Sequence, residues 1–521
     1  MKLKKLFLPL FGVVFFFSCS DDDGSIPETG GPLQESELIE SIEVQLNPSG
    51  YAPLSAILNL QTNQDVSVQI SVLGKNGNAS TITRVFEQVG TTFELPILGL
   101  YANYENQIEI NLLDSLGVLL ESQTLTVQTG TLIAEMPQIT INVPSNSLEP
   151  VFNFVNYFGV VELERFRPQR PFIFDQFGEI RWYLDFSTHP VLNDLFYDNG
   201  MTRLNNGNLL FGDGLTRSIY EIDMLGRIAN SWDLQGNGFH HHVIEKPNGN
   251  LLVTINDASK STVEDVIIEI DRNSGQFITT WDLNNSLDNT RRAWPTDLAD
   301  LQFDWFHANS IEHSETDNAI IVSGRTQGIV KLNAQNQVSY ILAPHREWNT
   351  SGNGTELSQF LLTPLDRDNQ PITDVDVLDG SENHPDFEWS WYQHSPILMP
   401  NGNLMVFDNG DNRNYTNFGP YSRAVEYEID ETNKTIKQVW QYGKERGEET
   451  YARIVSKVSY VPGNNSILFT PGSSVSGGSA AGKVIEINYD SKEVIFEATI
   501  TPPNSIFNIS FHNTLRMGLY D

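Results

Sequence analysis

The sequence predicts an all-β protein in which a six-bladed β-propeller follows a small β-sandwich of fibronectin or immunoglobulin type. Three observations predict this: short alternating strands over residues 38–130, a hairpin that recurs six times after residue 171, and a turn of Asn-Gly-Asn type that alternates with it. Of the 521 residues, 39% are hydrophobic, which is enough for large packed cores and excludes a mainly disordered chain.

The first 37 residues indicate export and a lipid anchor. Residues 1–18 combine a lysine-rich start with the apolar run 6–17, which is too short to span a bilayer and is typical of a secretory signal. The run leads to Cys19, the single cysteine, and an acidic flexible tether occupies 19–37. This arrangement resembles a bacterial lipoprotein signal. We therefore expect lipidation of Cys19 and a place in the cell envelope, either periplasmic or exposed on the outer membrane.

Residues 38–130 alternate polar and apolar side chains in short runs, for example at 66–72 and 107–112. About seven strands fit between the turn signals, as in a small antiparallel sandwich. We find no catalytic motif in this stretch. Residues 131–170 are rich in Pro and Asn and are expected to form a connector.

Residues 171–521 contain the repeat that predicts the propeller. Each hairpin reads apolar–polar–apolar–Asp/Asn, followed by a turn and a second strand that often ends in Trp. The six copies begin at Phe172, Tyr220, Ile268, Val330, Tyr427 and Ile485. The Asp or Asn suits the turn because its side chain can bond to the backbone that follows. Only five copies of the Asn-Gly-Asn element alternate with them, so we expect the C-terminal strand 511–517 to close the ring beside the hairpin at 172–186.

One position in each of five repeats falls at the same structural register. It lies eight residues before the centre of the Asn-Gly-Asn turn in four copies and ten residues before it in the copy with a longer turn. The residues found are Asn199, His241, His307, His394 and Ser456. Inner strands of a propeller begin at the central channel, so we expect these side chains to converge there. Three of the ten histidines at one register favour a shared site over separate structural roles.

Three imidazoles in a channel suit either a metal or an anion. Three histidines are a known zinc arrangement, but no carboxylate recurs at the register, and Arg325 would place a positive charge near the ion. Asn309 follows His307 by two residues on one face of a strand, and Arg325 can return to the same end of the blade. A guanidinium with amide and imidazole donors matches the oxygens of sulfate or phosphate. The pattern favours an anion site without a metal or another cofactor.

At these positions the sequence resembles the bacterial aryl sulfate sulfotransferase family. The resemblance rests on the residues around His240-His241-His242, on Asp304 to Ser310 with Val322 to Arg325, and on Tyr392 to Pro396 with Phe407 to Gly410. It covers nearly the whole mature chain and implies the same sandwich and propeller. The implied reaction moves a sulfuryl group from an aryl sulfate to a phenol without a nucleotide donor. The chain contains no Gly-rich phosphate loop, which agrees with this.

The resemblance also implies the catalytic residues. His394 resembles the histidine that becomes transiently sulfated, which implies a ping-pong transfer through a sulfohistidine. The groups that resemble the sulfate-binding and transition-state residues are His307, Asn309 and Arg325. His241 resembles the remaining site histidine, with His240 as the alternative register. The implied small-molecule partners are an aryl sulfate donor and a phenolic acceptor.

Two further assignments to the substrate site stay open in the sequence. Family members carry a hydroxyl residue from a late blade, and both Ser456 and Thr470 fit that role. The aromatic residues Trp305 and Tyr392 either stack on the aryl ring of the substrate or pack inside blades.

The sequence excludes one class of function and is compatible with two alternatives to sulfuryl transfer. The formal charge of −34 argues against nucleic acid, whose phosphates need a basic surface. One alternative is a non-catalytic surface propeller that binds sulfated or acidic glycans, which predicts binding without turnover. Another is a metal-dependent lyase or hydrolase acting on polysaccharide, which a chelator should inactivate. We expect membrane contact only through the lipid anchor, and the family's homodimers leave the oligomeric state open.

Overall fold

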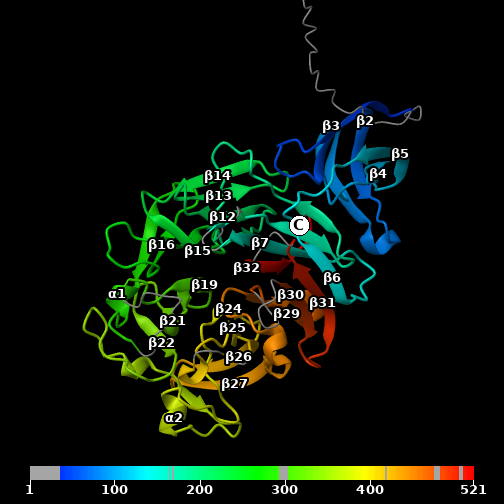
Figure 1. Ribbon diagram of the computed structural model, residues 1–521. Helices are drawn as coiled ribbons and strands as arrows, with labels where there is room; N and C mark the ends of the chain where they lie inside the picture. The colour runs from blue at the N-terminus through cyan, green and yellow to red at the C-terminus, as the bar shows by residue number, and fades with distance from the viewer. Residues whose placement is uncertain are drawn as a thin grey trace, which may run out of the picture.

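The computed structural model describes residues 36–162, 165–166, 169–196, 198–292, 303–416, 419, 421–473, 481–503 and 508–520. These residues form one N-terminal sandwich and six further sheets arranged in a ring (Figure 1). The signal, Cys19 and nearly all of the tether lie outside the described residues. Among the helices that are described, none combines the length and the apolarity required to cross a bilayer.

Over residues 36–130, all of them described, the sandwich has five strands where the sequence suggests about seven. They are β1 (Ile39–Leu46), β2 (Ser55–Val72), β3 (Ile82–Leu98), β4 (Glu105–Leu113) and β5 (Leu119–Gln128). The first half of β2 pairs with β1 and its second half with β4, while β3 accompanies β2 along both halves. Two long, bent strands that each serve two parts of the sheet therefore read in the sequence as four short ones.

The first three blades take their strands as follows. Blade one contains β32 (Asn508–Arg516), β7 (Phe152–Glu162), β9 (Phe172–Asp175) and β10 (Ile180–Tyr183), with β8 (Arg165–Phe166) paired to β7. Blade two contains β11 (Thr202–Arg203), β12 (Leu209–Asp213), β13 (Ser218–Ile222) and β14 (Ile228–Asp233). Blade three contains β15 (Gly238–Glu245), β16 (Leu251–Asn256), β17 (Val266–Ile270) and β18 (Phe277–Asp282).

The other three blades and the helices complete the described elements. Blade four contains β19 (Ala308–Ser314), β20 (Ala319–Gly324), β21 (Gly328–Leu332) and β22 (Val338–Leu342). Blade five contains β24 (His394–Leu398), β25 (Leu404–Asp408), β26 (Arg423–Asp430), β27 (Thr435–Tyr442) and β23 (Thr363–Leu365). Blade six contains β28 (Lys457–Val461), β29 (Ser466–Thr470), β30 (Gly482–Asn488), β31 (Val494–Thr501) and β6 (Gln138–Val143). The helices are α1 (Leu283–Ser286), α2 (Val375–Leu378) and the 3-10 turns η1 (Gly77–Ser80), η2 (Ser358–Phe360), η3 (Arg413–Tyr415), η4 (Lys444–Thr450) and η5 (Pro462–Asn464).

Both ends of the propeller chain close the ring. The C-terminal strand β32 pairs with β7 and is the innermost strand of blade one, as predicted, while β6 adds an outer strand to blade six. The expected connector 131–170 therefore supplies strands to two blades, and the propeller begins at β6 and not at residue 171. Its prolines mislead because Pro137, Pro144 and Pro150 stand just outside β6 and β7, where proline costs no ladder bond.

The recurrent Trp of the hairpin links four of the blades to the next blade. The side chains of Trp182, Trp232, Trp281 and Trp440 donate their indole N–H to a backbone carbonyl in the hairpin turn of the following blade, at 2.7–2.9 Å. The Asp or Asn of the turn accepts bonds from the backbone N–H groups that follow it, as predicted. The two sequence signals thus stabilise the turn and the contact between blades, respectively.

The sandwich is packed against blades one and two through a shared apolar core. Arg181 of β10 is fully buried in this contact. Its Nε donates to the carbonyl of Gly99 at 2.9 Å and its Nη1 to that of Ser80 at 3.2 Å, while Asp175 balances its charge at 2.9 Å. The guanidinium therefore bonds the propeller to the sandwich with its charge paired.

Candidate active site

Three residues of the predicted register, His241, His307 and His394, lie at or beside β-bulges of the inner strands. In β15, β19, β24 and β32 the pairing with the next strand is interrupted at this point. His241, His307 and Ser456 have left-handed backbones with φ of 49°, 57° and 85°. Such conformations are strained in residues other than glycine and concentrate at functional sites, and a bulge redirects the side chain at its position.

Imidazoles from four blades meet at the axis of the ring. The ring centroids of His241 and His307 are 4.9 Å apart, those of His241 and His512 5.1 Å, and those of His394 and His512 6.5 Å. The structure thus brings together all three histidines of the predicted register. It adds His512 from β32, which the register count omits.

A repeated dipeptide could have identified His512. Phe-His occurs at 239–240, 306–307 and 511–512, in each case inside or immediately before an inner strand. Each Phe packs against a glycine, which belongs to the same blade for Phe306 and to the neighbouring blade for Phe239 and Phe511. A Cβ atom at Gly212, Gly324 or Gly482 would collide with the respective Phe ring. The glycine leaves room for the Phe ring, and the bulge then directs the residues that follow.

The hydrogen bonds of His394 define its reactive nitrogen. Its Nδ1 lies 2.8 Å from Oδ1 of Asn409 and 3.0 Å from the carbonyl oxygen of Tyr392. The amide nitrogen of Asn409 donates to the carbonyls of Ala452 and Val455, so the amide oxygen must face the ring. Two acceptors require a proton on Nδ1 and leave the lone pair on Nε2. Burial lowers the pKa of His394 to about 3, so the ring is neutral at physiological pH.

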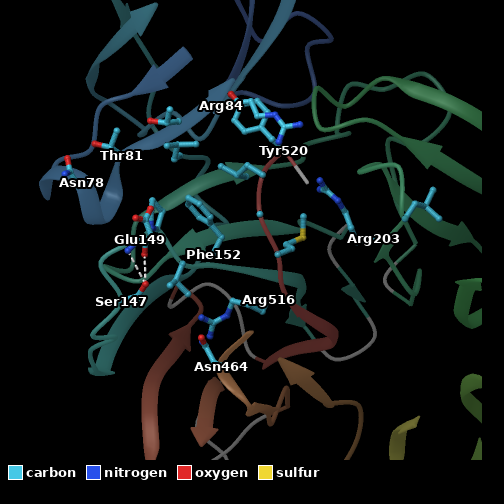
Figure 2. Close-up of a pocket in the computed structure, with 18 residues that line it drawn as sticks. Asn78, Thr81, Arg84, Ser147, Glu149, Phe152, Arg203, Asn464, Arg516 and Tyr520 are labelled. Atoms are coloured by element: carbon cyan, nitrogen blue, oxygen red, sulfur yellow. Dashed lines mark hydrogen bonds between the residues drawn. The ribbon is translucent and has the colours of Figure 1, made fainter. Parts of the chain in front are cut away.

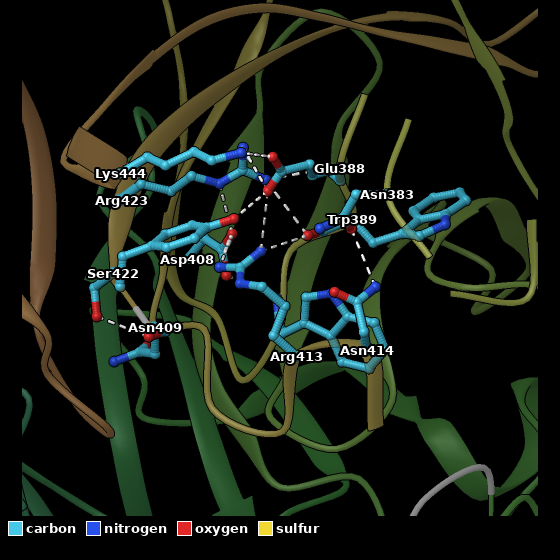
Figure 3. A network of polar contacts seen from close by, with 12 residues as sticks. Asn383, Glu388, Trp389, Asp408, Asn409, Arg413, Asn414, Ser422, Arg423 and Lys444 are labelled. Atoms are coloured by element: carbon cyan, nitrogen blue, oxygen red, sulfur yellow. Dashed lines mark hydrogen bonds and ion pairs between the residues drawn. The ribbon is translucent and has the colours of Figure 1, made fainter. Parts of the chain in front are cut away.

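A buried ion network supports Asn409 (Figure 3). Asp408, the preceding residue on β25, accepts bonds from Arg413 and Arg423 at 2.8 Å each. Both guanidinium groups also lie 3.6 Å from Glu388. Although burial raises the pKa of Glu388, Arg423 and its other cationic neighbours lower it to about 2. The end of β25, and with it the acceptor for His394, is held by fully paired charges.

His241 and His307 share a proton. Their Nε2 atoms are 2.9 Å apart, and each Nδ1 faces a carboxylate: His241 contacts Asp198, and His307 contacts Glu264 and, at 2.6 Å, Asp304. A ring nitrogen that faces a carboxylate carries hydrogen, and the bond between the Nε2 atoms needs one more. The pair therefore holds one positive charge. Burial and neighbouring imidazoles lower the pKa of His241 well below its usual value.

The three consecutive histidines of β15 take different directions. His241 reaches the other imidazoles, in agreement with its place in the predicted register. His240 pairs with Glu264 at 2.5 Å, and this carboxylate outweighs burial and raises the pKa of His240. His242 accepts a bond from the backbone N–H of Ile311 at 3.1 Å, and burial lowers its pKa to about 3. His240 is thus a neighbour of the axial pair whose charged form is favoured by Glu264.

Arg325 and Asn309 lie between blades four and five. Arg325 is buried, with Nη2 3.9 Å from Asp304 and its guanidinium carbon 6.0 Å from the ring centre of Tyr392. Asn309 donates one amide hydrogen to the carbonyl of Gln393 at 2.9 Å, so its second amide hydrogen remains for a ligand. The ring of Tyr392 is fully buried beside Arg325.

Ser456 lines the axis, whereas Thr470 does not. Ser456 borders a cavity of about 20 Å³ together with His394, His512 and Lys457. This volume suits about one water-sized group. Burial lowers the pKa of Lys457 to about 8. Thr470, the last residue of β29, uses its hydroxyl for bonds to the carbonyl of Lys457 and to Thr514, so it packs blade six against blade one.

Trp305 also belongs to the packing of the blades and not to a substrate-stacking surface. It is fully buried in the apolar cluster that includes Trp281 and Val322, and its indole N–H donates to Asp265 at 2.8 Å. It precedes the bulge that begins β19, so its ring points into the contact between blades three and four.

The axis contains carboxylates that the register count does not predict. Three groups of described residues have ligand atoms close enough for a metal: Asp198, His241 and His512; His240, His241 and Glu264; and Glu264, Asp304 and His307. No carboxylate stands at the register itself, in agreement with the sequence, but these three acids lie beside the imidazoles. Asp198, Glu264 and Asp304 lie in loops, at positions that do not belong to the predicted register of the repeat. Their bonds to imidazoles account for the arrangement with protons alone, and the absence of a metal remains a prediction.

Comparisons with known proteins decide the family. Residues 140–507 match the family model for arylsulfotransferase (ASST), and residues 43–130 match the arylsulfotransferase Ig-like domain. This chain belongs to the arylsulfotransferase family. Two relatives are each named arylsulfate sulfotransferase AssT. The protein from Escherichia coli O6:H1 is 29% identical over 88% of this chain and 90% of its own, and that from Lelliottia amnigena is 29% identical over 92% of each.

Solved structures give a weaker comparison for this arylsulfotransferase. Virginiamycin B lyase from Staphylococcus aureus superposes with a TM-score of 0.32 at 12% identity, over 78% of this chain and 95% of the lyase, and this similarity supports no argument about function. Membership in the family makes the chain a transferase. The resemblance noted in the sequence is thereby confirmed over most of the propeller and the sandwich.

Proposed function

We propose that this enzyme moves a sulfuryl group from an aryl sulfate to a phenol in a ping-pong reaction through a sulfohistidine at His394. The observation that carries the proposal is the state of His394, whose Nδ1–H is held by two oxygens while Nε2 keeps its lone pair. The neutral ring, the buried guanidinium of Arg325 and the shared proton of His241 and His307 together supply a nucleophile, an anion-binding cation and an acid.

In the first half-reaction, Nε2 of His394 attacks sulfur, so an N–S bond forms and the S–O bond to the aryl group breaks. The departing phenolate takes the shared proton from Nε2 of His307. The imidazolium of the intermediate keeps its Nδ1–H bonded to Asn409 and to the carbonyl of Tyr392, which stabilises its positive charge.

In the second half-reaction, the acceptor phenol gives its proton back to His307 as its oxygen attacks sulfur. The N–S bond breaks and His394 returns to its neutral state. Arg325 and the second amide hydrogen of Asn409 bind the sulfuryl oxygens in both steps. Loss of one such donor typically costs about 10²–10³ in turnover.

Intact mass after brief exposure to p-nitrophenyl sulfate tests the proposal. We expect one added sulfuryl group localised to His394, and release of p-nitrophenolate that accelerates when phenol is added. His394→Asn should abolish both, whereas His313→Asn, outside the axial cluster, should leave both unchanged. Tight binding of a sulfated ligand without turnover would instead indicate a non-catalytic binding protein. Inactivation by a chelator, with no adduct on His394, would indicate a metal-dependent reaction.

We also propose that the enzyme is held at the cell envelope by a lipid on Cys19. The lysine-rich apolar segment and the acidic residues that flank Cys19 support this. The full-length protein should partition with membranes, and Cys19→Ser should release it into the soluble fraction with its transfer activity intact. Membrane association that survives the substitution would contradict the anchor.

A further inference from the structure

A cleft with a volume of about 910 Å³ lies where the sandwich meets the propeller. Figure 2 shows its labelled groups on several sides: Arg84 and Tyr520 face Arg516 and Asn464 across the opening, with Arg203 at one flank and Glu149 at another. The cleft is separate from the axial histidines. Along β32, Arg516 follows His512 by four residues, which corresponds to about 13 Å of strand.

The charge in this cleft is opposite to that of the protein. The chain has 66 acidic and 32 basic side chains, yet three arginines and only one acidic residue, Glu149, line the cleft. Arg84 is exposed and forms no ion pair with any residue that the structure describes. Arg516 pairs with Glu486 at 2.6 Å, but within the described chain its buried Nε has no hydrogen-bond partner. The cleft therefore offers guanidinium donors to an anion.

Neutral polar groups accompany these cations. Besides Tyr520, the side chains that line the cleft with hydroxyl or amide groups are Asn78, Thr81, Thr83, Ser147 and Asn464. Such groups both donate and accept hydrogen bonds, as the hydroxyls of a sugar require. A cavity of this volume is far larger than a single inorganic anion and lies in the range of organic-ligand sites.

The walls of the cleft are fixed before any ligand binds. Tyr520 of the C-terminal segment accepts a bond from the backbone N–H of Leu98 at 2.8 Å and donates to the carbonyl of Pro96 at 3.2 Å. Arg181 joins the same two domains nearby. A preformed site loses little conformational entropy when it binds. From its charge, polar lining, size and rigidity, we infer that this cleft is a second ligand site that takes an acidic oligosaccharide bearing sulfate or carboxylate groups.

Calorimetry with the full chain and four probes of similar length tests the ligand class. The probes are a heparin-derived tetrasaccharide, a tetragalacturonate, neutral maltotetraose and a tetranucleotide. We expect one or both acidic saccharides to bind with an affinity that falls as salt rises, and maltotetraose not to bind. The two acidic probes distinguish sulfate from carboxylate as the preferred group. Binding of neither, or equal binding of the tetranucleotide, would overturn the assignment.

Substitutions locate the binding. Arg84→Ala with Arg203→Ala should raise the dissociation constant at least tenfold, about the effect of one lost charge-assisted bond. Arg217→Ala with Arg367→Ala removes two exposed arginines elsewhere and should change nothing. Asn78→Trp keeps every charge and should block the cleft sterically. Weaker binding in this variant would therefore not come from a change in net charge. Unchanged affinity in both cleft variants would overturn the site. Sulfuryl transfer to phenol should stay unchanged in all variants, so the result is independent of the proposed reaction.

Discussion

Nδ1 of His394 lies 2.8 Å from Oδ1 of Asn409, and this contact decides which nitrogen of the ring is available for attack. The amide orientation is itself fixed, because the Asn409 nitrogen donates to two backbone carbonyls. Together with the carbonyl of Tyr392, this side chain sets the tautomer of the proposed nucleophile, as hydrogen-bond partners commonly do for catalytic histidines.

Asn409→Ala should lower kcat about 10²-fold with little change in KM for the donor. Without the acceptor the ring can place its proton on Nε2, which reduces the population of the reactive tautomer. Steady-state kinetics with p-nitrophenyl sulfate measure this, and thermal unfolding checks that the fold survives. Asn414→Ala, whose amide bonds to Gly380 outside the axis, is the matched control. A change confined to KM would argue against a role through His394.

Nitrogen NMR of histidine-labelled protein should show His394 as the neutral Nδ1–H tautomer throughout pH 5–8. Burial lowers its pKa to about 3, so no titration is expected near the ordinary value of 6.5. The spectrum of His394→Asn identifies the signal. A midpoint between pH 6 and 7 for this ring would contradict the neutral buried nucleophile.

Glu264→Gln should reduce stability most between about pH 4.5 and 6.5. The imidazoles lower the pKa of Glu264 well below 4.5 despite its burial, so its contribution is present above 4.5 and is lost as pH falls through the lowered value. Glu264 raises the pKa of His240 above 6.5, so that contribution is present below 6.5 and is lost as pH rises through the raised value.

Chemical unfolding of wild type and Glu264→Gln across this pH range provides the measurement. Removing one partner of a buried pair typically costs about 3–5 kcal/mol, and we expect a difference of that order at its maximum. The exposed Glu347→Gln serves as control. A difference that stays constant from pH 4 to 9 would mean that the carboxylate does not interact with titrating imidazoles.

Arg325→Lys should slow formation of the sulfohistidine by about 10²–10³-fold. Lysine keeps the charge but loses the planar fork that can hold two sulfuryl oxygens at once. Rapid-mixing mass spectrometry follows the adduct, and Arg346→Lys on an exposed loop is the control. Wild-type kinetics in Arg325→Lys would place the sulfuryl group elsewhere in the channel.

The repeat makes the propeller readable from sequence because two signals recur at related spacings. The Trp and the Asp or Asn of each hairpin have direct structural roles, at the blade contact and in the turn. The register predicts the meeting of His241, His307 and His394 because inner strands have a bulge at equivalent positions. Trp305 stands two residues before that register and Thr470 ends the next strand of blade six, but their side chains pack inside or between blades.

The positions of the carboxylates at the site cannot be predicted from a fixed spacing in the repeat. Asp198 and Asp304 stand one and three residues before register positions, and Glu264 lies in a loop before β17. Loop lengths vary between repeats, so no fixed offset leads to these acids. His512 could be predicted from the sequence, because it belongs to the repeated Phe-His dipeptide. The prediction of a connector over residues 131–170 fails because the prolines of this segment lie at the ends of strands and not between domains.

Because β32 completes blade one and contributes His512, the axial cluster spans segments that are synthesised at different times. A nascent chain that has left the ribosome only as far as blade six already contains His241, His307 and His394, but it lacks the strand that brings the fourth imidazole to Asp198. Truncated translation products would therefore have an open ring and an incomplete centre. The ring and its cluster of four imidazoles would then be complete only once β32 has been made.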